Sequence, residues 1–88
     1  MGITAEQALA VAKAGIGTAI VSRHVREERM MDRNVAYEDI WNAIRTATKA
    51  KEQDNGTWRL YGGTDIDGDE LIVAVELRQT PYIIVTVM

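Results

Sequence analysis

The sequence changes its hydrophobic period once, near residue 56, and this change limits the chain to a fold that combines helices with a sheet. Before it, "VAYEDIWNAIRTATKAK" places apolar residues at intervals of three and four, as in an amphipathic helix. After it come three runs of β-branched and aromatic residues separated by turn residues. The two periods therefore predict an α+β fold, with helices first and a sheet after them.

The N-terminal part carries the signals of a short helix. Thr4 and Gln7 have the spacing of a capping box, and strong helix formers follow them. A helix is therefore expected over 5–14, with Gly15 as its stop. The glycine-rich "GIGTAIVS" that follows is expected to pair with a strand only briefly.

Two more helices are predicted before the change of period. Ser22 is a typical N-cap and Asn34 readily adopts a left-handed stop, so a helix is expected over 23–33. The third helix, over 37–50, has the clearest apolar stripe in the chain.

The remainder predicts a three-stranded antiparallel meander over 57–62, 70–77 and 82–87. Two to three N-terminal helices would pack on this sheet. Asp67-Gly68 marks the first turn and Thr80-Pro81 the second. The predicted core residues are Ile40, Trp41, Ile44, Leu60, Val73, Val75, Ile83 and Val85.

Size and composition favour a single cytoplasmic domain. We expect one domain over 1–88, in which 1–21 form a helix and connector and 22–88 the α+β core. The absence of cysteine fits a reducing compartment, and neither a signal peptide nor a membrane span is expected. The net charge of −3 argues against broad attraction to nucleic acid, so a role in RNA binding would need a local basic patch.

The acidic stretch "DIDGDELIVAVE" spaces its acids like a calcium-binding EF-hand loop. Glu70, however, occupies the place where that loop requires glycine, and the flanking segments are predicted strands rather than helices. We therefore interpret the stretch as a hairpin with an acidic tip, and expect neither a metal site nor a cofactor.

The most charged stretch is "SRHVREERMMDR", which holds the only histidine. On an α-helical wheel Arg26, Arg29 and Arg33 form a column on one side, and His24 lies nearly opposite. One interpretation is an exposed charged helix whose few apolar residues reach the core. The other is an arginine-rich site for an anion.

From Ser22 to Met88 the chain resembles the bacterial family known as domain of unknown function 4258. The matching pieces are His24, "RMMDR" with Arg29 and Arg33, Asn34-Val35, the helix at 37–50, "WRLYGG", "ELIVAVEL" and "IIVTVM". That family in turn resembles the RelE and BrnT group of ribonuclease toxins, compact α+β domains that cut RNA without a metal. The resemblance implies a RelE/BrnT-like fold and a metal-independent endoribonuclease of a toxin–antitoxin or related bacterial conflict system.

The resemblance also implies a set of site residues. Histidine has a reference pKa close to neutrality, so His24 is the first candidate for proton transfer. Arginines present paired donors that fit phosphate oxygens. The expected catalytic residues are His24, Arg29, Arg33, Arg59 and Thr86, and the expected RNA-binding residues are Arg23, Arg26 and Tyr61. We expect the catalytic set to converge on one concave surface.

Two departures from the family pattern keep a second function open. His24 precedes Arg29 by five residues where the family has four, and Met88 replaces a terminal tyrosine. The alternative is a non-catalytic module, similar to an antitoxin, an immunity protein or a phage inhibitor, that keeps the fold and binds a protein. The expected partners are therefore RNA or a cognate protein, and the sequence leaves a homodimer open.

Overall fold

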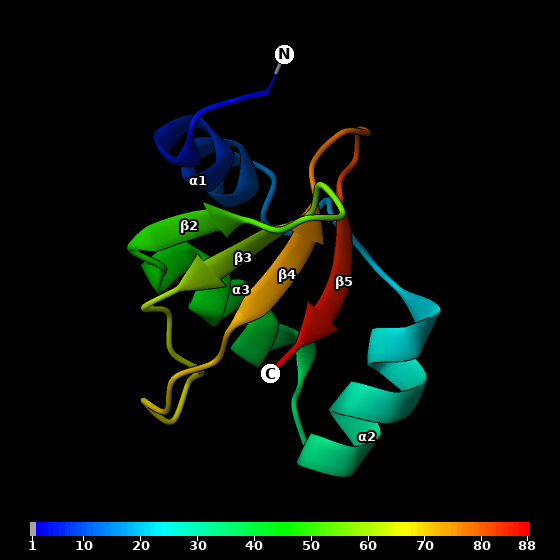
Figure 1. Ribbon diagram of the computed structural model, residues 1–88. Helices are drawn as coiled ribbons and strands as arrows, with labels where there is room; N and C mark the ends of the chain where they lie inside the picture. Colours follow the sequence, from blue (N-terminus) through cyan, green and yellow to red (C-terminus); the bar gives the residue numbers. More distant parts are fainter. Residues whose placement is uncertain (1) are drawn as a thin grey trace.

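The computed structural model describes residues 2–88, apart from the side chains of Arg29, Asp32 and Arg33. Figure 1 shows α3 behind a twisted sheet, α1 across one end of it and α2 beside β5. The helices are α1 (Ala5–Ala14), the π-helical η1 (Val25–Arg29), α2 (Met30–Arg33) and α3 (Tyr37–Thr46). The strands are β1 (Ile20–Val21), β2 (Lys49–Glu52), β3 (Trp58–Tyr61), β4 (Val73–Glu76) and β5 (Ile83–Val87).

The sheet has five strands in the order β1-β5-β4-β3-β2. The predicted meander is its centre, since β3, β4 and β5 pair antiparallel. The prediction of only three strands is wrong, because a strand is added on each side. β1 runs parallel to β5, where the Ile20 N–H donates to the Tyr82 carbonyl at 2.8 Å, and β2 pairs antiparallel with β3. The brief pairing expected before Ser22 is confirmed.

The first helix is confirmed at its predicted bounds, and the third is shorter than predicted. At the start of α1, the Gln7 N–H donates to the Thr4 hydroxyl at 3.1 Å, which completes the capping box. The expected helix over 37–50 ends at Thr46, and its last two predicted residues, 49 and 50, belong to β2. The reason is burial, since pairing with β3 places Ala50 in the core at 7% exposure.

The second helix spans the residues predicted for it, but it contains a π turn. The Ser22 hydroxyl accepts from the Val25 N–H at 3.3 Å, and Asn34 has a φ of 54°, so both predicted ends are confirmed. The Met30 N–H donates to the Val25 carbonyl, five residues earlier. A π turn holds more residues than an α turn, so the α-helical wheel does not describe this segment.

The core lies between the sheet and the helices α1 and α3, and most of its predicted members are confirmed. Fully buried among them are Ile40, Ile44, Leu60, Val73 and Val75. Trp41 is only partly buried. Ala8 and Ala12 of α1 belong to the same hydrophobic cluster, so the N-terminal helix and the sheet share one core.

The predicted face of β5 is wrong. Ile83 and Val85 are half-buried, whereas Ile84 and Val87 are fully buried. The physical reason is a β-bulge. Ala74 pairs with Thr86 and the next residue of β4 with Ile84, so Val85 is an extra residue and the strict alternation fails.

No helix in the described part of the chain is long and apolar enough to cross a membrane.

Candidate functional site

One face of the sheet carries a row of register partners from four strands, and the residues from three of these strands are polar. Register partners in neighbouring strands point their side chains to the same face. Lys51 pairs with Arg59, Arg59 with Ala74, and Ala74 with Thr86. Among the described elements no helix covers this side in Figure 1. We call it the open face, made up of Lys49, Lys51, Arg59, Tyr61, Ala74 and Thr86.

A hollow of about 340 Å³ lies on the open face, and we call it the Arg59 hollow. Strands stand about 4.8 Å apart, so the Cα atoms of Arg59 and Thr86, two strands apart, are separated by roughly 10 Å. The small side chain of Ala74 between them leaves room for a ligand that touches both. Its lining residues are Gln53, Asp54, Asn55, Thr57, Arg59, Ala74, Val85 and Thr86.

The open face gathers positive charge on an acidic protein. Lys51 is the direct register partner of Arg59, and Lys49 lies two residues away on the same side of β2. The chain as a whole has a net charge of −3. Lys49, Lys51 and Arg59 therefore form a local basic patch, next to which Asp54 lines the Arg59 hollow.

The β2–β3 turn, which forms one wall of the Arg59 hollow, is tied to the β4–β5 loop by Arg78. The Arg78 Nη2 donates to the Asn55 carbonyl at 3.2 Å, and its Nε donates to the Glu76 carboxylate at 2.9 Å. Gly56, with a φ of +86°, makes this approach possible, because a Cβ there would lie 2.7 Å from the Arg78 Nη1.

Acid is expected to reduce the stability difference between the wild type and Arg78→Gln. The side-chain hydrogen bonds from Arg78, and then that from its backbone N–H, lower the pKa of Glu76 from 4.5 to about 2. A carboxylate with a lowered folded-state pKa stabilises the fold above its unfolded-state pKa and loses that contribution as the pH falls. Urea unfolding should therefore show the full difference at neutral pH and a shrinking one between pH 4.5 and about 2.

Arg23→Gln is the matched control, because Arg23 pairs with Glu27 at 2.9 Å on an exposed helix face. It should change stability little at any pH. A difference for Arg78→Gln that is independent of pH would contradict the prediction.

The structure brings Arg59 and Thr86 together and places His24 on a neighbouring element. The Ser22 hydroxyl donates to the Val85 carbonyl at 3.3 Å, so the second helix begins beside a lining residue of the Arg59 hollow. His24 follows two residues later, exposed, with its Nδ1 3.0 Å from Glu28 Oε2. It is not among the residues that line the hollow.

The other predicted site residues lie around these. Arg23 and Arg26 are exposed on the second helix, and Tyr61 lies on the open face as the register partner of Lys49. The predictions for Arg29 and Arg33 concern side chains outside the described part of the structure. The convergence of the whole catalytic set therefore stays a prediction, with Arg59 and Thr86 as its described pair.

Sequence reasoning missed Lys49 and Lys51 because it placed Lys49 at the end of the helix over 37–50 and Lys51 directly after that helix. The signal was present in "KAKE", where Ala50 stands between two lysines in a period of two. A period of two that begins before residue 56 would have put both lysines on the outer side of an added strand.

The acidic turn after β3 uses its carboxylates to hold itself together. Asp65 Oδ1 accepts from the N–H groups of Asp67 and Asp69, both at 2.9 Å. Thr64 and Glu70 form an isolated antiparallel bridge around this turn, as expected for an acidic hairpin tip. Among the described side chains no group of three or more histidines, cysteines and acids is arranged to hold a metal ion.

Comparison with known proteins gives one match. No curated protein and no solved structure matches the chain. The family described as Domain of unknown function (DUF4258) matches residues 21–88, which include η1, α2, α3 and all five strands except Ile20 of β1. Since the match spans well over half of the sequence, the chain belongs to this family.

Proposed function

We propose that the protein is a metal-independent endoribonuclease, a toxin of a toxin–antitoxin or related bacterial conflict system, and that RNA binds on the open face. The observation that carries the proposal is the row of register partners from Lys51 through Arg59 to Thr86, with a hollow between the last two. An arginine and a hydroxyl line one hollow, and a lysine stands next to the arginine on the neighbouring strand. Such groups can bind a phosphodiester.

The proposed reaction uses the 2′-hydroxyl of the RNA as the nucleophile. A base takes the proton of the 2′-OH, the O2′–P bond forms, the P–O5′ bond breaks, and an acid protonates the leaving 5′ oxygen. Arg59 and Lys51 stabilise the negative charge that builds on the phosphate, and Thr86 donates a hydrogen bond to it. The products are a 2′,3′-cyclic phosphate and a free 5′-hydroxyl.

We assign one of the two proton transfers to His24. It lies at the start of a helix that Ser22 anchors to β5 beside the hollow, and its imidazole is exposed, with Nδ1 close to the Glu28 carboxylate. This contact, at an ion-pair distance of 3.0 Å from Nδ1 to Glu28, would orient the ring and leave Nε2 for the RNA. An RNA strand that crosses β5 from the Arg59 hollow would reach the helix start.

A second candidate function is the non-catalytic, protein-binding module. Asp54 lines the Arg59 hollow together with Arg59, and a carboxylate there opposes the binding of phosphate. The net charge of −3 also favours the protein-binding module over an RNA-binding protein.

Cleavage of single-stranded RNA in the presence of a chelator tests the proposal. We expect the wild type to yield 2′,3′-cyclic phosphate ends and His24→Ala to lose about 100-fold or more in rate, the range for general acid–base catalysis. Glu6→Gln, on the exposed side of α1, is a control that should cleave like the wild type. The absence of cleavage by pure wild-type protein would overturn the ribonuclease and leave the protein-binding module.

A further inference from the structure

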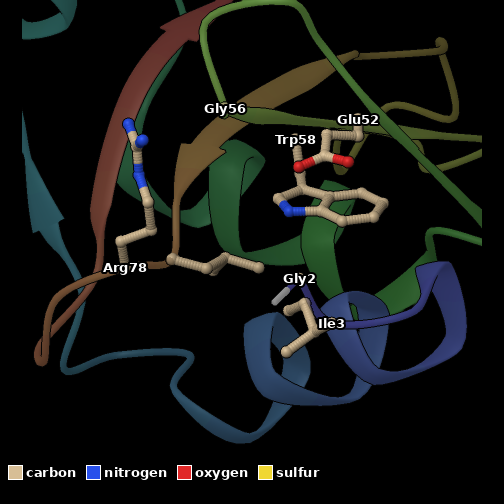
Figure 2. Close-up of a pocket in the computed structure, with 7 residues that line it drawn as sticks. Gly2, Ile3, Glu52, Gly56, Trp58 and Arg78 are labelled. Atoms are coloured by element: carbon tan, nitrogen blue, oxygen red, sulfur yellow. The ribbon is translucent and has the colours of Figure 1, made fainter.

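A second hollow, of about 360 Å³, lies on the helix side of the sheet, and we call it the Trp58 hollow. Figure 2 shows how the segment before α1, the β2–β3 hairpin and the β4–β5 loop meet around it. Its lining residues are Gly2, Ile3, Glu52, Gly56, Trp58, Leu77 and Arg78. Apolar walls, one carboxylate (Glu52) and one guanidinium (Arg78) thus surround one cavity.

The charges at this hollow leave Glu52 available to a ligand. Arg78 is bound to Glu76 and to the Asn55 carbonyl, and in Figure 2 its guanidinium points away from Trp58. The Glu52 carboxylate lies next to the indole in the same view. Within residues 2–88 no side-chain hydrogen bond or salt bridge to Glu52 is found. Among the described residues, Arg78 is neutralised by its ion pair with Glu76, so the Glu52 carboxylate leaves the lining of the hollow with a net negative charge.

We propose that the Trp58 hollow binds an arginine side chain of a basic partner polypeptide. The apolar stem of an arginine would pack against Ile3 and Leu77, and its planar guanidinium would donate to both oxygens of Glu52. Trp58 is a core residue and only 7% exposed, and the part of its indole that lines the hollow offers an aromatic surface to the same cation. The volume suits one long side chain, and the chain's net charge of −3 attracts a basic polypeptide.

This site does not depend on the proposed ribonuclease. Glu52 and Trp58 are register partners on the helix side of the sheet, whereas Arg59 and its partners point to the opposite side. Binding at the Trp58 hollow can therefore be measured without RNA and without activity.

The test is an NMR titration of the full chain with the peptide acetyl-Gly-Arg-Gly-amide. We expect saturable shifts of the Glu52 and Gly56 amides and of the Trp58 indole N–H, with a Kd on the order of 1 mM, as befits a single side chain. The peptide that carries citrulline in place of arginine keeps the shape and lacks the charge, and it should bind about tenfold more weakly.

Glu52→Gln should weaken the binding of the arginine peptide by about tenfold. Glu38→Gln, which loses the same charge on the exposed surface of α3, should leave the binding unchanged. Both positions are exposed, and the amide spectra report that each variant is folded. Equal binding of the citrulline peptide, no effect of Glu52→Gln, or no saturable shifts would each overturn the proposal. Binding of guanosine monophosphate at these amides more tightly than the arginine peptide would also overturn it, in favour of a nucleobase.

Discussion

A Gly63→Ala substitution is expected to destabilise the protein by about 3 kcal/mol or more, at the upper end of the cost of overpacking. A Cβ at Gly63 would overlap the Ala43 carbonyl oxygen and lie 2.7 Å from the carbonyl carbon. Both atoms belong to the backbone of α3, so a side-chain rotation cannot relieve the clash. The chain would have to lift the loop after β3 away from the helix.

That loop is held to α3 by several hydrogen bonds that such a movement would break. Asn42 Nδ2 donates to the Thr64 carbonyl at 2.8 Å, and the Thr64 N–H donates to the Thr46 hydroxyl at 2.9 Å. The loss of stability would therefore include hydrogen bonds that the new methyl group does not itself touch.

Urea unfolding of Gly63→Ala measures the effect, and Gly2→Ala is the matched control. No heavy atom lies within 4 Å of a Cβ at Gly2, and its φ is not positive. The control should leave stability unchanged or slightly raised. Equal midpoints for the two variants would show that the loop and α3 are not packed as described.

The clash at Gly63 illustrates what the sequence could not predict. Periodicity identified the helices, the three central strands and most of the core, because one buried face imposes a regular spacing. It carries no information on where a loop rests against a helix, since that contact depends on backbone positions brought together by the whole fold.

The errors at the ends of the sheet have a similar cause. β1 has only two residues, which is too short to show a period. β2 has four residues, and its alternation was hidden because it follows the helical pattern of α3 after two residues. The bulge at Val85 depends on the pairing of β5 with β4, and because of it Ile84 is buried where Ile83 and Val85 were expected to be. Local pattern therefore predicts the central elements well, and it predicts poorly a very short strand, a strand close to the end of a helix, or a bulge.

The candidate site was predictable where it depends only on the alternation of side chains between the two faces of a strand. Arg59 and Tyr61 alternate with Trp58 and Leu60, so their shared face could be predicted from β3 alone. The register of β5, which brings Thr86 into line with Ala74, could not. The position of His24 also depends on the start of the second helix at Ser22, and on the π turn that follows it.

Replacement of Arg59 by alanine is expected to have the largest effect on activity. If the open face binds and cleaves RNA as we propose, the variant loses the cation nearest the phosphate in the Arg59 hollow. Removal of one group that stabilises developing negative charge costs about 100-fold to 1,000-fold in rate. Arg59→Lys should recover only part of this loss, because an ammonium cannot donate in a bidentate way to phosphate.

Arg45→Ala is the matched control, since it removes the same charge from the exposed surface of α3. RNA binding at several salt concentrations separates a direct phosphate contact from a general charge effect. The slope of log K against log salt should fall in magnitude by about 0.7 for Arg59→Ala, the value for one contact to a single strand. It should stay unchanged for Arg45→Ala. Equal losses of rate and slope in both variants would mean that RNA responds to the charge of the whole protein, and the open face would not be its binding site.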